Sequence, residues 1–259
     1  MEWSVSPEIV QIGPFVLRWY SLMFMVAFLL GFYIMKWIFK IENKPETYLN
    51  DLFVYVFLGT VIGARLGHCF FYDPTYYLSH TVEVLQVWKG GLASHGAAVG
   101  ILTAIYFLVK NKKRLTFLWV VDRVVITVAL AGFFIRLGNF FNSEILGRAA
   151  EVPWAVVFAR VDNLPRHPAQ LYEALAYLLI FAGLFLYYRK NVGDVNDGFL
   201  FGLFLVSVFT ARFFLEFFKE NQSPFEQDWT LNMGQLLSVP FVVIGIVLLL
   251  KKKGETLRE

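Results

Sequence analysis

Long apolar runs separated by short polar links dominate the sequence. Seven of these runs approach the ~20 residues that a helix needs to cross a bilayer. No stretch shows a pattern that predicts a strand. The sequence therefore predicts an all-α integral membrane protein with seven transmembrane helices in one membrane-embedded domain, residues 1–259. The runs lie at about residues 19–35, 52–72, 91–109, 115–135, 170–188, 198–218 and 233–250.

The first 16 residues precede these runs and have a different character. They mix apolar residues with Pro7 and Pro14 and are too short to span, so they predict an interfacial N-terminal arm. Glu2 and Glu8 are present without any lysine or arginine, whereas a cleavable signal peptide begins with basic residues.

Composition supports the membrane assignment. Of the 259 residues, 58% are hydrophobic and 17% charged, whereas soluble domains have about 45–50% apolar and about 25% charged residues. The formal charge of +3 is spread over short clusters, which argues against a nucleic-acid partner. The single cysteine, Cys69, excludes an internal disulfide and lies in an apolar run, where we interpret it as a packing residue.

The basic residues of the links predict an orientation, because cytoplasmic links carry an excess of lysine and arginine. One set of links and the C-terminal tail hold 13 basic residues: Lys36, Lys40, Lys44, Lys110, Lys112, Lys113, Arg114, Arg189, Lys190, Lys251, Lys252, Lys253 and Arg258. The opposite set holds 5, which are Lys89, Arg148, Arg160, Arg166 and Lys219. We therefore expect an outward N-terminus, a cytoplasmic C-terminus and an outward head segment at 138–167.

Several charged residues fall inside the predicted spans, where each costs roughly 2.5–3.5 kcal/mol on insertion scales. Arg65 and His68 share one face of the second span, which also carries the small pair Gly63 and Gly67 that favours close helix packing. Arg65 is either an anchor for packing or part of a site. Asp122 and Arg123, near the cytoplasmic end of the fourth span, are interpreted as interface anchors.

A second group of polar residues shares one predicted depth, in the outer half of the membrane or at its outer surface. His95 lies between Ser94 and Gly96, and Arg212 and Glu216 have the i, i+4 spacing of an ion pair. A cavity lined by arginines and an imidazole would explain the shared depth, although each residue also has a purely structural interpretation. The group comprises His95, Arg136, Glu144, His167, Tyr172, Arg212 and Glu216.

The stretch RLGNFFNSEILG, residues 136–147, ends the fourth run with a dense set of hydrogen-bonding groups. Such groups at headgroup depth suit recognition of an anionic lipid headgroup. The alternative is that Arg136 only snorkels to the interface and Asn139 caps a helix.

The sequence gives little support to metal, serine-hydrolase or nucleotide-binding chemistry. The four histidines, at 68, 80, 95 and 167, have neither HxxxH nor HExxH spacing, so no metal is expected. No GxSxG turn indicates a serine hydrolase, and no glycine-rich nucleotide motif follows a strand.

Residues 136–147 resemble the signature GRxGNFxNxExxG of bacterial prolipoprotein diacylglyceryl transferases. Ile135 stands where the family usually has glycine, which leaves the local backbone packing open. The resemblance covers essentially the whole chain, because six more segments match in the same order: RWYSLMF, GARLGHCFFY, GGLASHG, RHPAQLYEA, RFFLEFFK and MGQLLSVP.

The resemblance implies an enzyme of the bacterial plasma (inner) membrane that needs no metal or organic cofactor. Its substrates would be phosphatidylglycerol and the lipobox cysteine of a preprolipoprotein. Its products would be a thioether-linked diacylglyceryl lipoprotein precursor and glycerol 1-phosphate. Arg136 and Arg212 are then expected to clamp the phosphate, and His95 to be the base unless the positive pocket alone activates the thiol. The headgroup site would be shaped by Tyr20, Asn139, Glu144, Gly147 and Glu216.

Two other classes of function compete with this interpretation. A small lipid transporter would also hold intramembrane arginines, but it should show an inverted repeat with broken helices, which we do not find. A non-catalytic lipid-binding protein would need no base beside the arginines.

Overall fold

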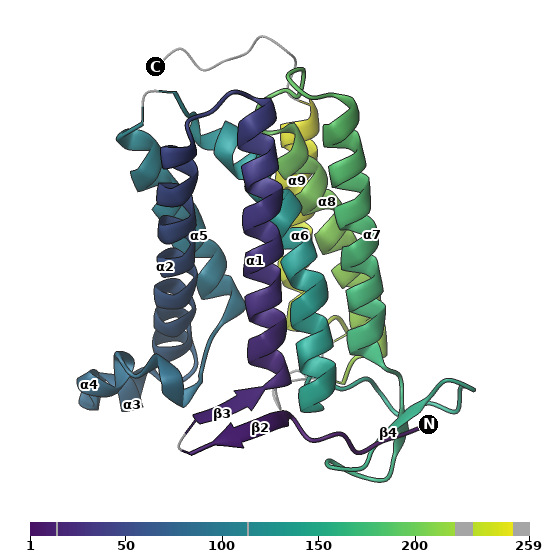
Figure 1. Cartoon of the computed structure of the whole chain (residues 1–259). Helices are drawn as coiled ribbons and strands as arrows, with labels where there is room; N and C mark the ends of the chain where they lie inside the picture. The colour runs from purple at the N-terminus through teal and green to yellow at the C-terminus, as the bar shows by residue number, and fades with distance from the viewer. Residues whose placement is uncertain (14, 113, 221–229, 251–259) are drawn as a thin grey trace. The chain divides into compact units, whose positions relative to one another are not determined.

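The computed structural model describes residues 1–13, 15–112, 114–220 and 230–250, and is mostly helical (Figure 1). It divides into two compact units. Unit 1 comprises Met1–Ile34 and Asp122–Glu259, and unit 2 comprises Met35–Val121. The prediction of one domain is not tested by this division.

Each predicted apolar run corresponds to a helix. Within the described residues, six helices are long and apolar enough to cross a membrane, and α5 is shorter, at 17 residues. The chain is therefore a multi-pass membrane protein, and the seventh span stays a prediction. The helices are α1 (Trp19–Ile41), α2 (Glu46–Phe71), α5 (Ser94–Lys110), α6 (Phe117–Asn142), α7 (Ala169–Lys190), α8 (Phe199–Leu215, continued by the 3-10 turn η2, Glu216–Phe218) and α9 (Met233–Leu250).

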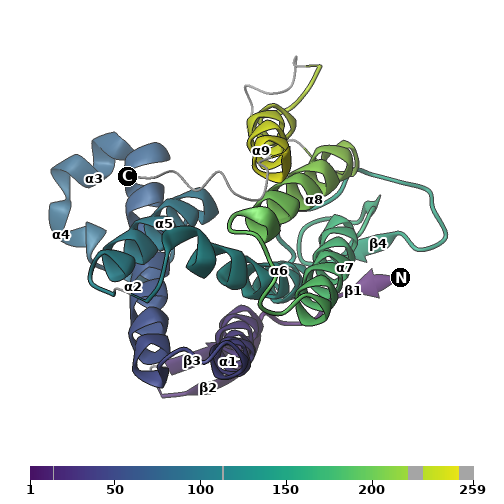
Figure 2. The same ribbon diagram turned by 90° about the horizontal axis from the view of Figure 1, so that it is seen from above.

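In unit 1, α8 packs against both α7 and α9 and lies between them when viewed along the helices (Figure 2). Helix α6 differs from the prediction at its C-terminal end. Its apolar run stops near residue 135, but the helix continues to Asn142. Backbone hydrogen bonds extend a helix through polar residues, so hydropathy alone misplaced this end.

The expectation of a chain without strands is wrong for the N-terminal arm and the head segment. In unit 1, β2 (Glu8–Ile12) and β3 (Phe15–Arg18) form an antiparallel pair. β1 (Glu2–Trp3) pairs in parallel with β4 (Val156–Phe158), which pairs antiparallel with β5 (Pro165–Arg166). Strands this short give little periodicity to recognise.

The three-stranded sheet has a small core of its own. Phe140 of α6 packs with Val156 and Phe158, which are all buried, and Trp3 covers them with its ring centroid 4.4 Å from that of Phe140. The first residues of the chain therefore hold the head segment against the end of α6.

Asp122 and Arg123 are not interface anchors. Both are buried, at 0% and 2% exposure. The Asp122 carboxylate accepts hydrogen bonds from the amides of Gly198 (2.7 Å) and Phe201 (2.8 Å), the residues that begin α8. Asp122 therefore satisfies the orphan donors of a helix that starts 77 residues further along the chain.

In unit 2, α2 and α5 run side by side (Figure 1). A Cβ atom added to Gly63 would lie 2.8 Å from the Cα of Gly100, and one added to Gly67 would lie 2.7 Å from the Cα of Gly96. The predicted role of Gly63 and Gly67 in close packing is confirmed, because only glycine permits this backbone approach.

The segment that joins α2 to α5 folds into α3 (Pro74–Ser79), α4 (Thr81–Val84) and the 3-10 turn η1 (Val87–Lys89). Buried Arg65 of α2 holds this segment. Its guanidinium donates to the carbonyls of Glu83 (2.6 Å), Val84 (3.0 Å) and Gly90 (2.6 Å). Of the two roles left open for Arg65, these contacts favour the packing anchor.

Candidate functional site

The site begins on the last turns of α6. Arg136 and Asn139 lie one turn apart, and Arg136 Nη1 donates to Asn139 Oδ1 at 3.0 Å. Asn139 Nδ2 in turn donates to Glu144 Oε2 at 3.2 Å. The Glu144 carbonyl accepts from Gln170 Nε2 at 2.6 Å, which ties the end of α6 to the start of α7. The alternative in which Asn139 is only a helix cap is incomplete, because its side chain bridges Arg136 and Glu144.

A tight reversal of the backbone places Glu144 beside Asn139. The Glu144 amide donates to the Asn139 carbonyl at 3.0 Å, and the Ser143 amide to the Phe140 carbonyl at 3.1 Å, as in a Schellman motif. Ser143 and Ile145 adopt positive φ of 57° and 55°, which is costly for residues other than glycine. Strain of this kind persists where surrounding contacts fix the turn, here the bond from Gln170.

Ion pairs extend the site from α6 across α7 to the end of α8. Arg136 Nε lies 3.0 Å from Glu173 Oε2, and Glu173 Oε1 lies 3.6 Å from Lys219 Nζ. Lys219 Nζ also lies 2.9 Å from Glu216 Oε1, which lies 3.5 Å from Arg212 Nε. The predicted pairing of Arg212 with Glu216 is confirmed. We call this chain of five residues the charge network.

The charge network alternates in sign and ends in an arginine on each side, so its formal net charge is +1. The Arg136 and Glu173 side chains are 14% and 1% exposed, whereas that of Arg212 is 33% exposed. The Arg136–Glu173 contact is close but not aligned as a hydrogen bond. Inner charges are therefore neutralised by neighbours, and the terminal arginines offer the excess positive charge.

Glycines bring the neighbouring segments close to this network. A Cβ at Gly138 would lie 2.8 Å from the ring of Tyr20, the second residue of α1, so Tyr20 packs directly on the α6 backbone. A Cβ at Gly147 would collide with the His167 carbonyl, and one at Gly234 with the Glu216 carboxylate. These approaches place Tyr20 and Gly147 in unit 1 with the network.

The head segment holds Lys219 by its backbone. Gly147 and Lys219 form an isolated antiparallel bridge. The Arg148 amide donates to the Phe218 carbonyl and Arg148 Nε donates to the Lys219 carbonyl, both at 2.9 Å. With its backbone fixed in this way, the Lys219 ammonium is directed between two glutamates.

Buried Arg166 braces the same part of the head segment. It donates to the Gly147 carbonyl at 3.1 Å and pairs with Glu220 and Asp162. The hydrogen bond from Arg166 holds the pKa of Asp162 below its ordinary value. This brace should persist at neutral pH, where Asp162 is ionised.

His95 belongs to unit 2 and begins α5. Its ring is exposed and makes an edge contact with Phe71 at 5.1 Å and a tilted contact with Tyr72 at 5.9 Å. The structure thus brings seven of the predicted site residues together in unit 1. His95 lies in unit 2, where its ring neighbours are aromatic. The proposed role of His95 as a base stays a prediction.

Sequence reasoning missed two members of the charge network. Lys219 was counted only as an outward basic residue, although it follows Glu216 by three positions and could have been recognised as its partner. Glu173 lies near the start of α7, and nothing local in the sequence links it to Arg136, 37 residues earlier. Among the described residues, no three His, Cys, Asp or Glu side chains gather as a metal site requires.

These features define a multi-pass membrane protein with a largely buried site. The site lies where α6 and α8 end and α7 begins, and an arginine stands at each end of its charge network. Comparisons with known proteins are specific. The family model described as prolipoprotein diacylglyceryl transferase matches residues 7–251. The chain therefore belongs to the prolipoprotein diacylglyceryl transferase family and is a transferase.

Relatives match over nearly the full length. The phosphatidylglycerol–prolipoprotein diacylglyceryl transferase of Chloroherpeton thalassium is 51% identical over 247 residues, covering 95% of this chain and 92% of the relative. The protein of the same name from Tolumonas auensis is 48% identical, covering 99% of each chain. That of Bacteroides fragilis strain YCH46 is 42% identical, covering 95% of this chain and 93% of the relative.

Proposed function

We propose that this protein transfers the diacylglyceryl group of phosphatidylglycerol to the lipobox cysteine of preprolipoproteins, the first step of lipoprotein maturation. The substrate thiolate attacks the glycerol carbon that carries the phosphate ester. A C–S bond forms, the C–O bond breaks, and glycerol 1-phosphate leaves with the bonding electron pair. The thiol proton passes to a base, so charge and atoms balance without a cofactor.

The observation that carries this proposal is the charge network with an arginine at each end. Guanidinium is the best bidentate partner for phosphate, and positive charge beside the leaving oxygens stabilises the negative charge that develops there. Arg136 and Arg212 would bind the phosphate, and the acids Glu173 and Glu216 would orient them. Tyr20, Asn139, Glu144 and Gly147 would shape the space around the headgroup.

Activation of the thiol is the second requirement. A free thiol has a pKa near 8.5, so at neutral pH it needs a base or a positive pocket. His95 is the proposed base. The nucleophile belongs to the substrate, and Cys69, at 0% exposure, plays no part in the transfer.

The membrane arrangement that fits this reaction has seven spans in a single domain of the bacterial inner membrane, with the head segment outside and the C-terminus in the cytoplasm. A cysteine introduced at Ala150 should react with an impermeant thiol reagent in intact cells, and one introduced at Glu255 should not. The opposite labelling pattern would refute the orientation.

Activity is tested directly with purified protein, phosphatidylglycerol and a lipobox peptide. The peptide should gain the mass of a diacylglyceryl group while glycerol phosphate is released, and a peptide with serine in place of the cysteine should not react. A lipid transporter or a non-catalytic lipid-binding protein would leave both peptides unchanged.

A further inference from the structure

Helix α5 is short for a spanning helix. Its 17 residues extend about 26 Å, less than the ~30 Å of a bilayer's hydrocarbon core, whereas its partner α2 has 26 residues. The deficit must be covered by lipid or by neighbouring side chains. A groove lies at the C-terminal end of α5, the end opposite His95.

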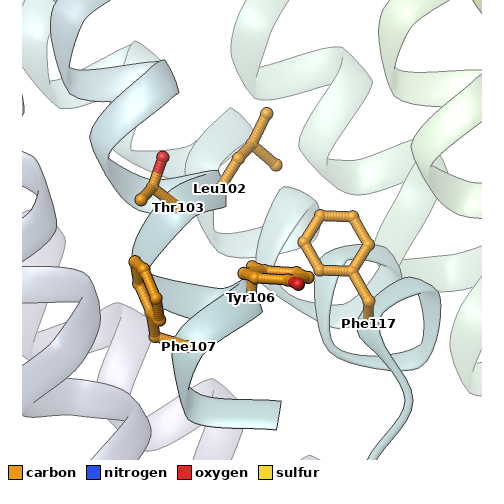
Figure 3. A pocket seen from close by; sticks show the side chains of 5 residues that line it. All are labelled: Leu102, Thr103, Tyr106, Phe107 and Phe117. Carbon is orange, nitrogen blue, oxygen red and sulfur yellow. The ribbon is translucent and has the colours of Figure 1, made fainter. Parts of the chain in front are cut away.

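The groove lies in unit 2 and has a volume of about 330 Å³. It is lined by Leu102, Thr103, Tyr106 and Phe107 of α5 and by Phe117, the first residue of α6. In the view of Figure 3 the ring of Phe117 lies next to the edge of the Tyr106 ring, with Leu102 above them. The Tyr106 and Phe107 side chains are 56% and 53% exposed, so the groove is open and largely apolar.

Each wall of the groove is followed or preceded in sequence by an exposed basic residue. Lys110 follows Tyr106 by four residues and Phe107 by three, so all three share one face of α5. Arg114 precedes Phe117 by three residues. Within the part of the chain that the structure describes, neither Lys110 nor Arg114 makes an ion pair, and both are exposed.

Two other basic residues near this link, Lys112 in it and Lys44 in the link between α1 and α2, are already engaged within unit 2. Lys112 pairs with Asp51, and Lys44 donates to the Arg114 carbonyl at 3.1 Å. The second of these contacts fixes the backbone that carries the Arg114 side chain. The positive charge left for a ligand is therefore located where the apolar groove meets the polar link.

We propose that this groove binds an anionic phospholipid, with one acyl chain along Tyr106 and Phe117 and the phosphate at Lys110 and Arg114. An apolar channel that ends in two cations complements an anionic amphiphile, and the surrounding bilayer supplies one. The groove lies at the opposite end of α5 from His95, and none of its lining residues belongs to the charge network. It therefore holds a bound lipid that the transfer reaction does not consume.

The test uses the full-length protein in detergent, with dioleoyl phosphatidic acid and dioleoyl phosphatidylcholine as probes and native mass spectrometry to count retained lipids. Each cation near a lipid phosphate contributes about fivefold in affinity, so Lys110→Gln with Arg114→Gln should weaken one phosphatidic acid site about thirtyfold. Thr103→Phe, which fills the groove, should abolish the same site. The matched control, Arg189→Gln with Lys190→Gln at the end of α7, should retain it.

Three outcomes would overturn the proposal. One is an unchanged number of bound phosphatidic acid molecules in both groove variants. Another is a loss in the charge variant with none in Thr103→Phe, because no chain would then occupy the groove. The third is retention of phosphatidylcholine as strong as that of phosphatidic acid in the wild type. Transferase activity should be unchanged in every variant, so failure here is distinguishable from failure of the proposed reaction.

Discussion

Two regions of this molecule bury an arginine by different means. The guanidinium of Arg65 in unit 2 donates hydrogen bonds to the neutral carbonyls of Glu83, Val84 and Gly90. Arg136 in unit 1 faces the carboxylate of Glu173 and the amide oxygen of Asn139, in a network that ends in a second arginine. The first arrangement fixes a loop and leaves few donors, whereas the second leaves a formal net charge of +1, which the proposed function assigns to the phosphate. Burial of an arginine therefore does not by itself indicate a binding site, and its acceptors must be considered as well.

The largest expected effect is on the terminal arginines of the charge network. Arg136→Lys and Arg212→Lys should each lose most activity although the charge is retained, because an ammonium cannot reproduce a planar pair of bonds to phosphate. Two charge-assisted bonds at roughly ten- to a hundredfold each imply a loss of about 10²–10⁴-fold. The measurement is the rate of peptide modification by variants that insert normally.

The alternative for the same residues is anchoring at the interface, where lysine snorkels nearly as well as arginine. Near-wild-type rates in both lysine variants would therefore support anchoring. If only one variant is active, that arginine is an anchor and the other holds the phosphate alone.

His95→Gln tests whether unit 2 takes part in the chemistry at all. General-base assistance is worth at least about 10²-fold, so the rate near neutral pH should fall by that factor. It should recover in part as pH rises, because the substrate thiol then ionises without help. A pH–rate profile identical to that of the wild type would reduce His95 to a packing role.

Arg65 should respond in the opposite way to Arg136. Arg65→Met leaves three partly buried carbonyls without their donor, at up to about 1–3 kcal/mol each, so the melting temperature should fall and residues 80–91 should become sensitive to protease. Arg65→Lys should restore part of the stability and keep transfer within a few-fold of wild type. A stable but inactive Arg65→Lys protein would place this arginine in the catalytic machinery and remove the contrast.

The smallest effect is expected at Cys69, in the same helix as Arg65. A buried free cysteine behaves as a small apolar residue, so Cys69→Ala should cost about 1 kcal/mol of stability and keep most of the activity. Loss of turnover in a folded variant that binds lipid would indicate a covalent enzyme intermediate, and the direct displacement proposed above would be wrong.

Much of this protein follows from its sequence alone. The apolar helices of the described residues were predictable because the bilayer sets a minimum length for apolar runs. The i, i+4 spacing predicted the Arg212–Glu216 pair, and the small pair at Gly63 and Gly67 predicted a close helix contact. The motif at residues 136–147 predicted Arg136, Asn139 and Glu144 as site residues, and the structure shows that their side chains are linked by hydrogen bonds. All of these signals are local, because each depends on residues close together along the chain.

Only the tertiary structure joined Arg136 to Glu173, and Glu173 to Lys219, because these residues lie on three elements far apart in sequence. The same holds for Asp122, whose partners at the start of α8 show why a charge can be buried there. The short strands of the head segment were also not predicted, because two or three residues carry too little periodicity. Hydropathy describes each residue's preference for lipid or water, whereas the choice of partner for a buried charge depends on which helices pack together.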